Sequence, residues 1–380
     1  MFLVCILSVS AISATQDTTN EKVTSIDNNE NDLETNIRYD DVSTSNNNDE
    51  LILEENNGQD EEIRFRTDKT TANDDPLTFT DLNTIINDND NSTIYLSHNY
   101  KYNNASDTNF INGITINRDL TIYGNGVTLD GIRCARIFDV TNSKRNVNFY
   151  NIIFINGKSE GDGGAIYRGN AINCTFIGNN ARHGGSIANG NAYNCTFIGN
   201  NAQFGGAIYN GNATNCNFTE NTQAMYGGAI YNGNATNCNF TKNTAVNMGG
   251  AIYEGDATNC VFTKNSVEFM GGAIFGGDAY NCTFSENSAS EDGGAIIGNA
   301  YNCNFTGNYA YCQGGAISSG GATNCVFTGN SASGGGAING GTATNCNFTE
   351  NTAKQGGAIY DGNAYNCTFI GNNAQFGGAI

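Results

Sequence analysis

The sequence is poor in the residues that several classes of protein depend on. It has no tryptophan, one proline, two histidines, and 17 lysine and arginine residues against 37 acidic ones, for a net charge of −20. A pI near 4.2 and the lack of a basic patch argue against nucleic-acid binding. His98 and His183 stand alone, and there is neither a nucleophile motif nor a glycine-rich phosphate loop with a lysine. These absences leave few routes to catalysis.

Long hydrophobic runs are scarce as well. Residues 1–14, MFLVCILSVSAISA, have the length and the small terminal residues of a signal peptide, and they are too few to span a membrane. We therefore expect secretion and no transmembrane span. Residues 15–76 hold 18 acidic and 5 basic residues, a net −13, with few large apolar side chains. Such a composition predicts an acidic, disordered leader or linker.

What the sequence has in abundance is repetition. GGAI or GGSI begins eleven times between Gly163 and Gly377, at intervals of 21 or 22 residues. Between successive copies lies Asn-Cys-x-Phe-x-x-Asn, which is complete ten times from Asn173 to Asn372. A fixed period of this length indicates a solenoid. The unit is Gly, Asn and Thr with single apolar residues, which favours strands over helices.

The repeat predicts an all-β fold, a right-handed single-stranded parallel β-helix of the pectin-lyase-like kind with 21–22 residues per coil. Cys and Phe two positions apart share one face of a strand, so identical residues should stack in interior columns. The Asn column should mark a corner with stacked amides, and Gly-Gly another corner. We expect these columns to include Ile208, Ile230, Cys216, Cys238, Phe218, Phe240, Asn221 and Asn243.

Residues 77–160 are expected to cap the solenoid and lead into it. The stretch 79–86 has helical spacing and an N-cap at Thr80 or Asp81, which predicts a short amphipathic helix over the open end. Short alternating runs then predict three or four irregular coils, with strands at 93–96, 114–116, 120–123, 127–129, 137–140 and 147–155. Residues 161–380 form the regular coils. Because the chain stops inside a GGAI phrase, we expect it to be a truncated copy of a longer surface protein.

The alternating GGAI and Phe-x-x-Asn motifs resemble the repeat of the polymorphic membrane proteins of chlamydiae. The Asn/Thr-rich composition and the lead-in LTIYGNGVTLDG, IFDV and IIFINGKSEGDGGAIY are similar to adhesin-like surface proteins of methanogenic archaea. The resemblance covers about residues 77–380. It implies a secreted or cell-surface β-helix associated with adhesion, and it carries over no catalytic residue.

Ten cysteines, one in each Asn-Cys-x-Phe phrase, should form one column. Cβ atoms of neighbours on parallel strands lie about 4.8 Å apart, whereas a disulfide prefers roughly 3.5–4.5 Å. Buried thiols are therefore favoured over disulfides, and over a metal site. We expect no metal and no cofactor, since the unit also differs from the nine-residue repeat that binds calcium.

The turn before Gly-Gly is where coil length varies, and such turns commonly carry binding. It holds Phe204, Tyr226, Met248 and Met270 on four successive coils. These side chains either point outward as an apolar stripe for a partner or glycan, or they fill the core, as most apolar columns in a solenoid do. The tyrosines after GGAI could stack on sugars or be ordinary residues of a sheet surface.

The function predicted is a non-enzymatic, adhesin-like surface protein that is structural or that binds host or cell-wall glycans or surface proteins. The alternative is a carbohydrate-active β-helix enzyme, a polysaccharide lyase or hydrolase, which needs clustered carboxylates. The one candidate cluster lies in the irregular coils and comprises Asp130, Asp139, Glu160 and Asp162 with Arg133 and Arg136. No repeated coil carries an inserted loop that could build a cleft around it.

Overall fold

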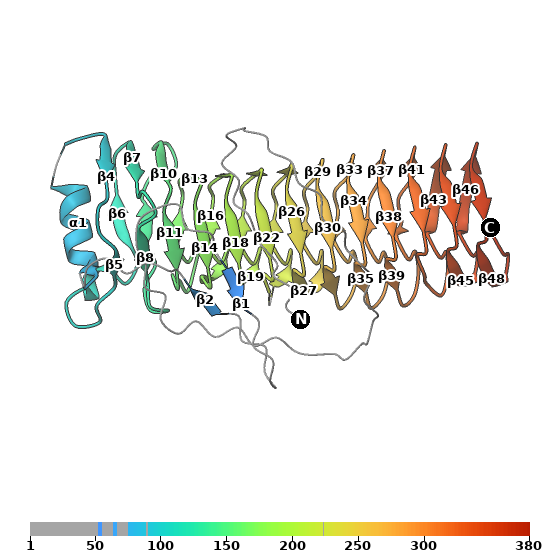
Figure 1. The fold of residues 1–380 in the computed structure, drawn as a ribbon, viewed down its shortest axis with the longest axis horizontal. Helices are drawn as coiled ribbons and strands as arrows, with labels where there is room; N and C mark the ends of the chain where they lie inside the picture. The colour runs from blue at the N-terminus through green and yellow to red at the C-terminus, as the bar shows by residue number, and fades with distance from the viewer. Residues whose placement is uncertain (1–51, 55–63, 67–74, 89, 223) are drawn as a thin grey trace, which may run out of the picture. The chain divides into compact units, whose positions relative to one another are not determined.

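The chain divides into two units, Met1–Asp75 and Pro76–Ile380. The computed structural model describes residues 52–54, 64–66, 75–88, 90–222 and 224–380 (Figure 1). The expected signal peptide lies outside the described residues, and so does most of the acidic leader. In the first unit, β1 (Ile52–Glu54) pairs antiparallel with β2 (Arg64–Arg66). Within the described ranges, no helix has both the length and the apolarity to cross a bilayer.

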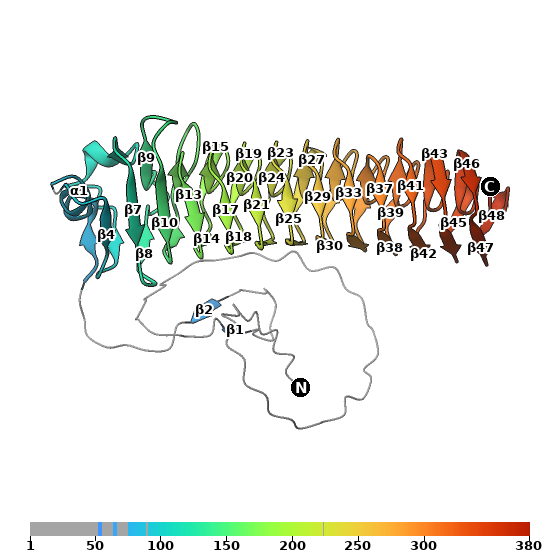
Figure 2. The same ribbon diagram turned by 90° about the horizontal axis from the view of Figure 1, so that it is seen from above.

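The second unit is a right-handed parallel β-helix, which confirms the predicted fold class. Its strands stack in register along one axis (Figures 1 and 2). In one coil, β20 (Ile208–Tyr209) and β21 (Ala213–Thr214) belong to a first sheet, β22 (Asn217–Thr219) to a second and β23 (Ala224–Tyr226) to a third. Each strand pairs with its counterpart one coil later. The narrower resemblance to pectin lyases stays a prediction.

The three sheets contain 23, 14 and 7 strands among the described residues. The first comprises β4 (Thr93–Tyr95), β6 (Ile114–Ile116), β7 (Leu120–Tyr123), β9 (Phe138–Val140), β10 (Val147–Tyr150), β12 (Ile166–Tyr167), β13 (Asn170–Ile172), β16 (Ile187–Ala188), β17 (Ala192–Tyr193), β20, β21, β24 (Ile230–Tyr231), β25 (Ala235–Thr236), β28 (Ile252–Tyr253), β29 (Ala257–Thr258), β32 (Ile274–Phe275), β33 (Ala279–Tyr280), β36 (Ile296–Ile297), β37 (Ala300–Tyr301), β40 (Ile317–Ser318), β41 (Ala322–Thr323), β43 (Ile338–Thr344) and β46 (Ile359–Tyr365). The second comprises β3 (Leu77–Thr78), β5 (Tyr100–Lys101), β8 (Thr128–Asp130), β11 (Ile153–Ile155), β14 (Thr175–Ile177), β18 (Thr196–Ile198), β22, β26 (Asn239–Thr241), β30 (Val261–Thr263), β34 (Thr283–Ser285), β38 (Asn304–Thr306), β42 (Val326–Thr328), β44 (Asn347–Thr349) and β47 (Thr368–Ile370). The third comprises β15 (Asn180–His183), β19 (Asn201–Phe204), β23, β27 (Thr244–Met248), β31 (Ser266–Val267), β35 (Ser288–Ala289) and β39 (Tyr309–Ala310), and β45 (Thr352–Gln355) pairs separately with β48 (Asn373–Phe376).

The interior is built from columns of identical residues. Ile208, Ile230, Phe218 and Phe240 are fully buried. The Phe rings stack face to face at centroid distances close to the strand spacing, for example 4.7 Å between Phe218 and Phe240. Each regular coil therefore repeats the packing of the one before it, and the main hydrophobic core of the described residues runs from Phe79 to Ile359. A smaller cluster of Ala224, Ala245, Val267 and Ala289 lies apart from it.

One corner is a ladder of buried asparagines. Asn243 Oδ1 accepts hydrogen bonds from the backbone N–H of Asn221 at 3.1 Å and from its Nδ2 at 2.9 Å. Asn243 Nδ2 donates to the carbonyl of Phe218 and to Oδ1 of Asn265, both at 3.0 Å. The side chain is fully buried. An amide fits this corner because it supplies both an acceptor and two donors where water is absent.

The other corner needs glycine for two different reasons. Gly249, the first glycine of its GGAI phrase, has φ +68°, in the left-handed region. The second, Gly250, has no room for a side chain, because a Cβ atom there would lie 2.0 Å from the carbonyl oxygen of Gly272 in the next coil. The Gly-Gly pair thus combines a positive φ with the close approach of the next coil, and it forms the corner that the sequence predicted.

The cysteine column consists of free thiols that are buried except for the partly buried Cys367, and all twelve described cysteines are free. Cys238 Sγ accepts a hydrogen bond from the backbone N–H of Cys216 at 3.4 Å. The Cys238 thiol donates in turn to the carbonyl oxygen of Thr236 at 3.2 Å. Hydrogen bonding to Cys216, together with burial, raises the pKa of Cys238 to about 12. Cys238 is therefore uncharged at neutral pH and packs as a small apolar side chain.

The N-terminal end is covered by α1 (Phe79–Asn87), which lies across the first coils in Figure 1. The helix buries Phe79, Leu82 and Ile86, as the helical spacing suggests. The expected N-cap was wrong, because Thr78 caps the helix and Asp81 occupies the third helical position of a capping box. Four strands of the second sheet, β3, β5, β8 and β11, precede residue 160 and form the irregular coils. The run at 147–155 breaks into two strands at Asn151, which has φ +53°.

A buried carboxylate holds this cap in place. Asp107 Oδ2 accepts from the N–H of Phe79 at 2.9 Å and of Asn103 at 2.8 Å, and its Oδ1 accepts from Thr80 Oγ1 at 2.7 Å. Burial raises the pKa of Asp107, but the hydrogen bonds from Thr80, Asn103 and Phe79 together lower it by more. The pKa of Asp107 is therefore below its ordinary value.

We expect Asp107→Ala to destabilise the capped end by about 1–3 kcal/mol, because buried N–H groups lose their acceptor. Since the folded pKa is depressed, the stabilisation is present above the unfolded pKa of about 4 and is lost as the pH falls through the folded value. Amide hydrogen exchange of α1, followed from pH 6 to 2.5, measures this. Glu160→Gln is the control, since Glu160 is 91% exposed. Equal protection of α1 in Asp107→Ala and the wild type would contradict this role.

Candidate functional site

The turn before Gly-Gly places apolar side chains in a row at the end of the third sheet. His183, Phe204 and Tyr226 lie on β15, β19 and β23, and Tyr226 pairs in turn with Met248 and Met248 with Met270. We call these five residues the turn column. All five are partly exposed and lie outside the hydrophobic core. The structure thus places the predicted binding residues Phe204, Tyr226, Met248 and Met270 at the surface of one edge.

A second row of rings, the tyrosine column, packs against the first. It comprises Tyr209, Tyr231, Tyr253 and Phe275, which stack on successive coils at 5.0–5.5 Å and within 16° of parallel. Phe204 meets Tyr231 edge to face at 5.5 Å, and Tyr226 lies 5.0 Å from Tyr253. In the sequence the two rows are separate features. In the structure the chain turns at the Gly-Gly corner, and this turn brings the turn column into contact with the tyrosine column.

Three further apolar residues extend this surface. Met225, Val246 and Phe269 lie one or two positions before Tyr226, Met248 and Met270, and they are 38%, 39% and 41% exposed. We call the two columns with these three residues the apolar edge. The sequence interpretation missed them. The sequence signal that could have identified these residues is their position in the longer turns. Within these turns the strand register between β23 and β27 shifts between Ala224 and Tyr226.

The electrostatics around Tyr231 and Tyr253 favour neutral phenols. Burial, the charge of Glu254 and a hydrogen bond to that carboxylate raise the pKa of Tyr253 to about 12. Burial and Glu254 also raise the pKa of Tyr231. The hydroxyl groups of Tyr231 and Tyr253 therefore remain hydrogen-bond donors at all physiological pH values.

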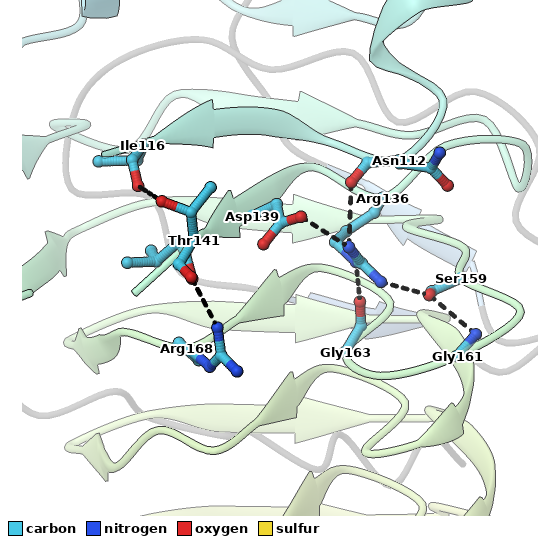
Figure 3. Close-up of polar contacts among 10 residues, drawn as sticks. Asn112, Ile116, Arg136, Asp139, Thr141, Ser159, Gly161, Gly163 and Arg168 are labelled. Carbon is cyan, nitrogen blue, oxygen red and sulfur yellow. Dashed lines mark hydrogen bonds and ion pairs between the residues drawn. The ribbon is translucent and has the colours of Figure 1, made fainter. Parts of the chain in front are cut away.

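The candidate catalytic cluster in the irregular coils is only partly brought together. Figure 3 shows Arg136 directed at the carbonyls of Asn112 and Gly163 and at Ser159 Oγ, at 2.8–3.1 Å, and its Nη1 lies 3.4 Å from Asp139. Burial lowers the pKa of Arg136, and Asp139 and Asp162 oppose that shift. Each arm of the guanidinium bonds to a different segment, so Arg136 ties the irregular coils to the first regular one.

The remaining carboxylates have separate partners. Asp130 lies on β8 in the second sheet, where it accepts from Asn156 Nδ2 at 3.1 Å, while Arg133 Nε lies 3.5 Å from Asn156 Oδ1. Asp139 lies on β9 in the first sheet. Glu160 pairs with Lys158 at the surface.

Asp162 shares a 2.6 Å hydrogen bond with His183 Nδ1, so His183 does not stand alone as the sequence suggested. This pair joins the N-terminal end of the turn column to the candidate cluster. Within the part of the chain that the structure describes, no three His, Cys, Asp or Glu side chains gather as a metal ion would require.

Solved structures with a detectable similarity to this chain include a bacterial and a viral protein. The surface adhesin PfbA of Streptococcus pneumoniae matches with 11% identity and a TM-score of 0.35, over 78% of this chain and 93% of that one. ORF18 of Geobacillus virus E2 matches with 12% identity and a TM-score of 0.34, over 73% of this chain and 54% of that one. With TM-scores below 0.5, neither match bears on function.

No curated protein matches the sequence. The family model of the Chlamydia polymorphic membrane protein repeat matches residues 237–253, 281–298, 302–320 and 345–361. These segments carry the GGAI and Asn-Cys-x-Phe phrases on which the resemblance was based. The coils of this β-helix are thus confirmed as similar to the Chlamydia polymorphic membrane protein repeat.

Proposed function

We propose that this chain is a secreted or cell-surface, adhesin-like β-helix that catalyses no reaction and makes contact through its apolar edge. The observation that carries the proposal is the gathering of partly exposed Phe, Tyr and Met side chains on one edge. Large exposed apolar side chains that lie together mark contact surfaces more often than scattered ones do. The similarity of the repeats to those of a polymorphic membrane protein supports the surface location.

The enzyme alternative finds less support. A glycosidase needs two carboxylates facing one bond, and a lyase needs a base beside bound substrate. Here Asp130 and Asp139 belong to different sheets, and Asp162 is engaged by His183. We therefore assign Arg136, Asp139 and Asp162 to the joining of coils. The proposed ligands are host or cell-wall glycans or surface proteins.

The test is binding of the full chain to a panel of glycans, cell-wall polysaccharides and cell-surface protein ectodomains, with reducing ends and unsaturated products measured in the same wells. We expect binding without product, weakened about tenfold by the double variant Tyr226→Ser/Met248→Ser, as for interface anchors. Val326→Ser is the matched control, because Val326 is also 38% exposed but lies on β42 in another sheet. Product formation abolished by Asp130→Asn or Asp162→Asn would overturn the proposal, and so would equal binding by all variants.

A further inference from the structure

The geometry of the tyrosine column limits what the apolar edge can bind. A sugar packs its C–H bonds against the face of an aromatic ring, where the π-electron density is negative. Tyr231 has Tyr209 stacked on one face at 5.1 Å and Tyr253 on the other at 5.0 Å. Its faces are covered, and only ring edges and the hydroxyl reach the surface. A row of such rings offers no platform for a sugar along its length.

The side chains that remain exposed suit another ligand. Met225, Val246 and Phe269 are the most exposed apolar residues of the edge, and partly exposed Met248 and Met270 lie beside them. Methionine adapts its shape to a partner, and Met, Phe and Tyr are enriched at protein–protein interfaces. Flexible apolar side chains over several coils match the anchors of a polypeptide better than the hydroxyl groups of a glycan.

The charge around these residues narrows the partner further. Residues 225–292 contain seven acidic and two basic residues, a net charge of −5. The two lysines, Lys242 and Lys264, pair with Glu220 and Glu286. Glu254, Glu268, Glu291 and Asp292 lie on or next to the coils of the apolar edge. A second copy of this chain would bring like charges together, whereas a basic partner would complement them.

We infer that the apolar edge binds a polypeptide segment that places apolar side chains over Met225, Val246 and Phe269 and Lys or Arg side chains beside Glu254 and Glu268. The inference rests on the proposed function and names the chemistry of its partner. The aromatic columns form the support of this surface, and the Met, Val and Phe side chains form its contact layer.

The test uses the full chain and synthetic 20-residue peptides that alternate Leu with Lys, Leu with Glu, or Ser with Lys. We expect the Leu–Lys peptide to bind at least about tenfold more tightly than the other two, since it alone supplies both the anchors and the charge. Met225→Ser/Phe269→Ser and Glu254→Gln/Glu268→Gln should each weaken its binding about tenfold, and Val326→Ser should not. Added salt should weaken binding through screening.

Other outcomes would overturn the inference. Equal binding of the Leu–Lys and Leu–Glu peptides would show that Glu254 and Glu268 do not select a basic partner. Binding of cellohexaose to the edge, lost in Tyr226→Ser/Met248→Ser, would make the partner a glycan and leave the proposed function standing. Self-association in sedimentation that Met225→Ser/Phe269→Ser abolishes would make the partner a second copy. If neither these probes nor the panel bind, the proposed function fails as well.

Discussion

Replacing Gly250 by alanine is expected to destabilise the centre of the solenoid by roughly 3 kcal/mol or more, as severe overpacking does. The added Cβ would lie 2.0 Å from the carbonyl oxygen of Gly272 and 2.7 Å from that of Ser266. Both contacts are with backbone of the next coil, which cannot rotate away as a side chain would. Because the same glycine stacks in every coil, the coils must separate locally.

The measurement is amide hydrogen exchange across neighbouring coils, since solenoids need not unfold in one step. The matched control is Gly329→Glu. Gly329 has φ +64° with no atom near its Cβ position, and Glu220 and Glu350 occupy the equivalent place in other coils at φ 55° and 56°. We expect this control to cost about 1 kcal/mol or less. Equal effects of the two substitutions would show that the coils tolerate separation.

Asn243→Leu should have an effect of similar size for a different reason. The leucine removes the acceptor of the Asn221 backbone N–H and the donor to the Phe218 carbonyl, both within the buried corner. Each buried polar group left without a partner costs about 1–3 kcal/mol, so the expected loss is about 2–6 kcal/mol. Urea unfolding followed by circular dichroism, with hydrogen exchange of Asn221, measures it.

Asn239→Val serves as the control for this experiment. Asn239 is exposed, bonds through Nδ2 to Asn217 at 2.9 Å and is replaced by Val261 in the next coil. Its substitution should change the free energy of unfolding by no more than about 0.5 kcal/mol. A stability loss as large for Asn239→Val as for Asn243→Leu would contradict the role assigned to the buried ladder.

The repeat made the architecture predictable because each coil packs on a copy of itself. The period, the strand positions and the side chains of Ile208, Phe218 and Asn221 follow from residues that recur at fixed spacing. The cap was harder. Thr80 and Asp81 look like N-caps, but Thr78 is preferred because the Asp81 carboxylate can accept from the Thr78 N–H and Asp107, 26 residues beyond Asp81, can accept from the Phe79 N–H at the helix start.

The candidate surface was predictable in part. The turn column was visible in the sequence, since Phe204, Tyr226, Met248 and Met270 share one place in the repeat. Its contact with Tyr231 and Tyr253 depends on the path of the chain around the Gly-Gly corner, which spacing alone does not give. The stacking that covers the tyrosine faces likewise arises between coils. His183 and Asp162 are 21 positions apart, which is one coil, so their pairing could be predicted only once the register between successive coils was known.

The uniform columns also have an evolutionary consequence. Phe240 meets Phe218 on one side and Phe262 on the other at nearly the same distance, so each regular coil offers its neighbours the same ring surface in this column. Recombination between repeats in the gene can therefore add or delete a whole coil without a mismatch at the new junction. Each such event changes the length of the β-helix by about 4.8 Å. The length of the β-helix can thus change while the stacking within the Phe column is kept.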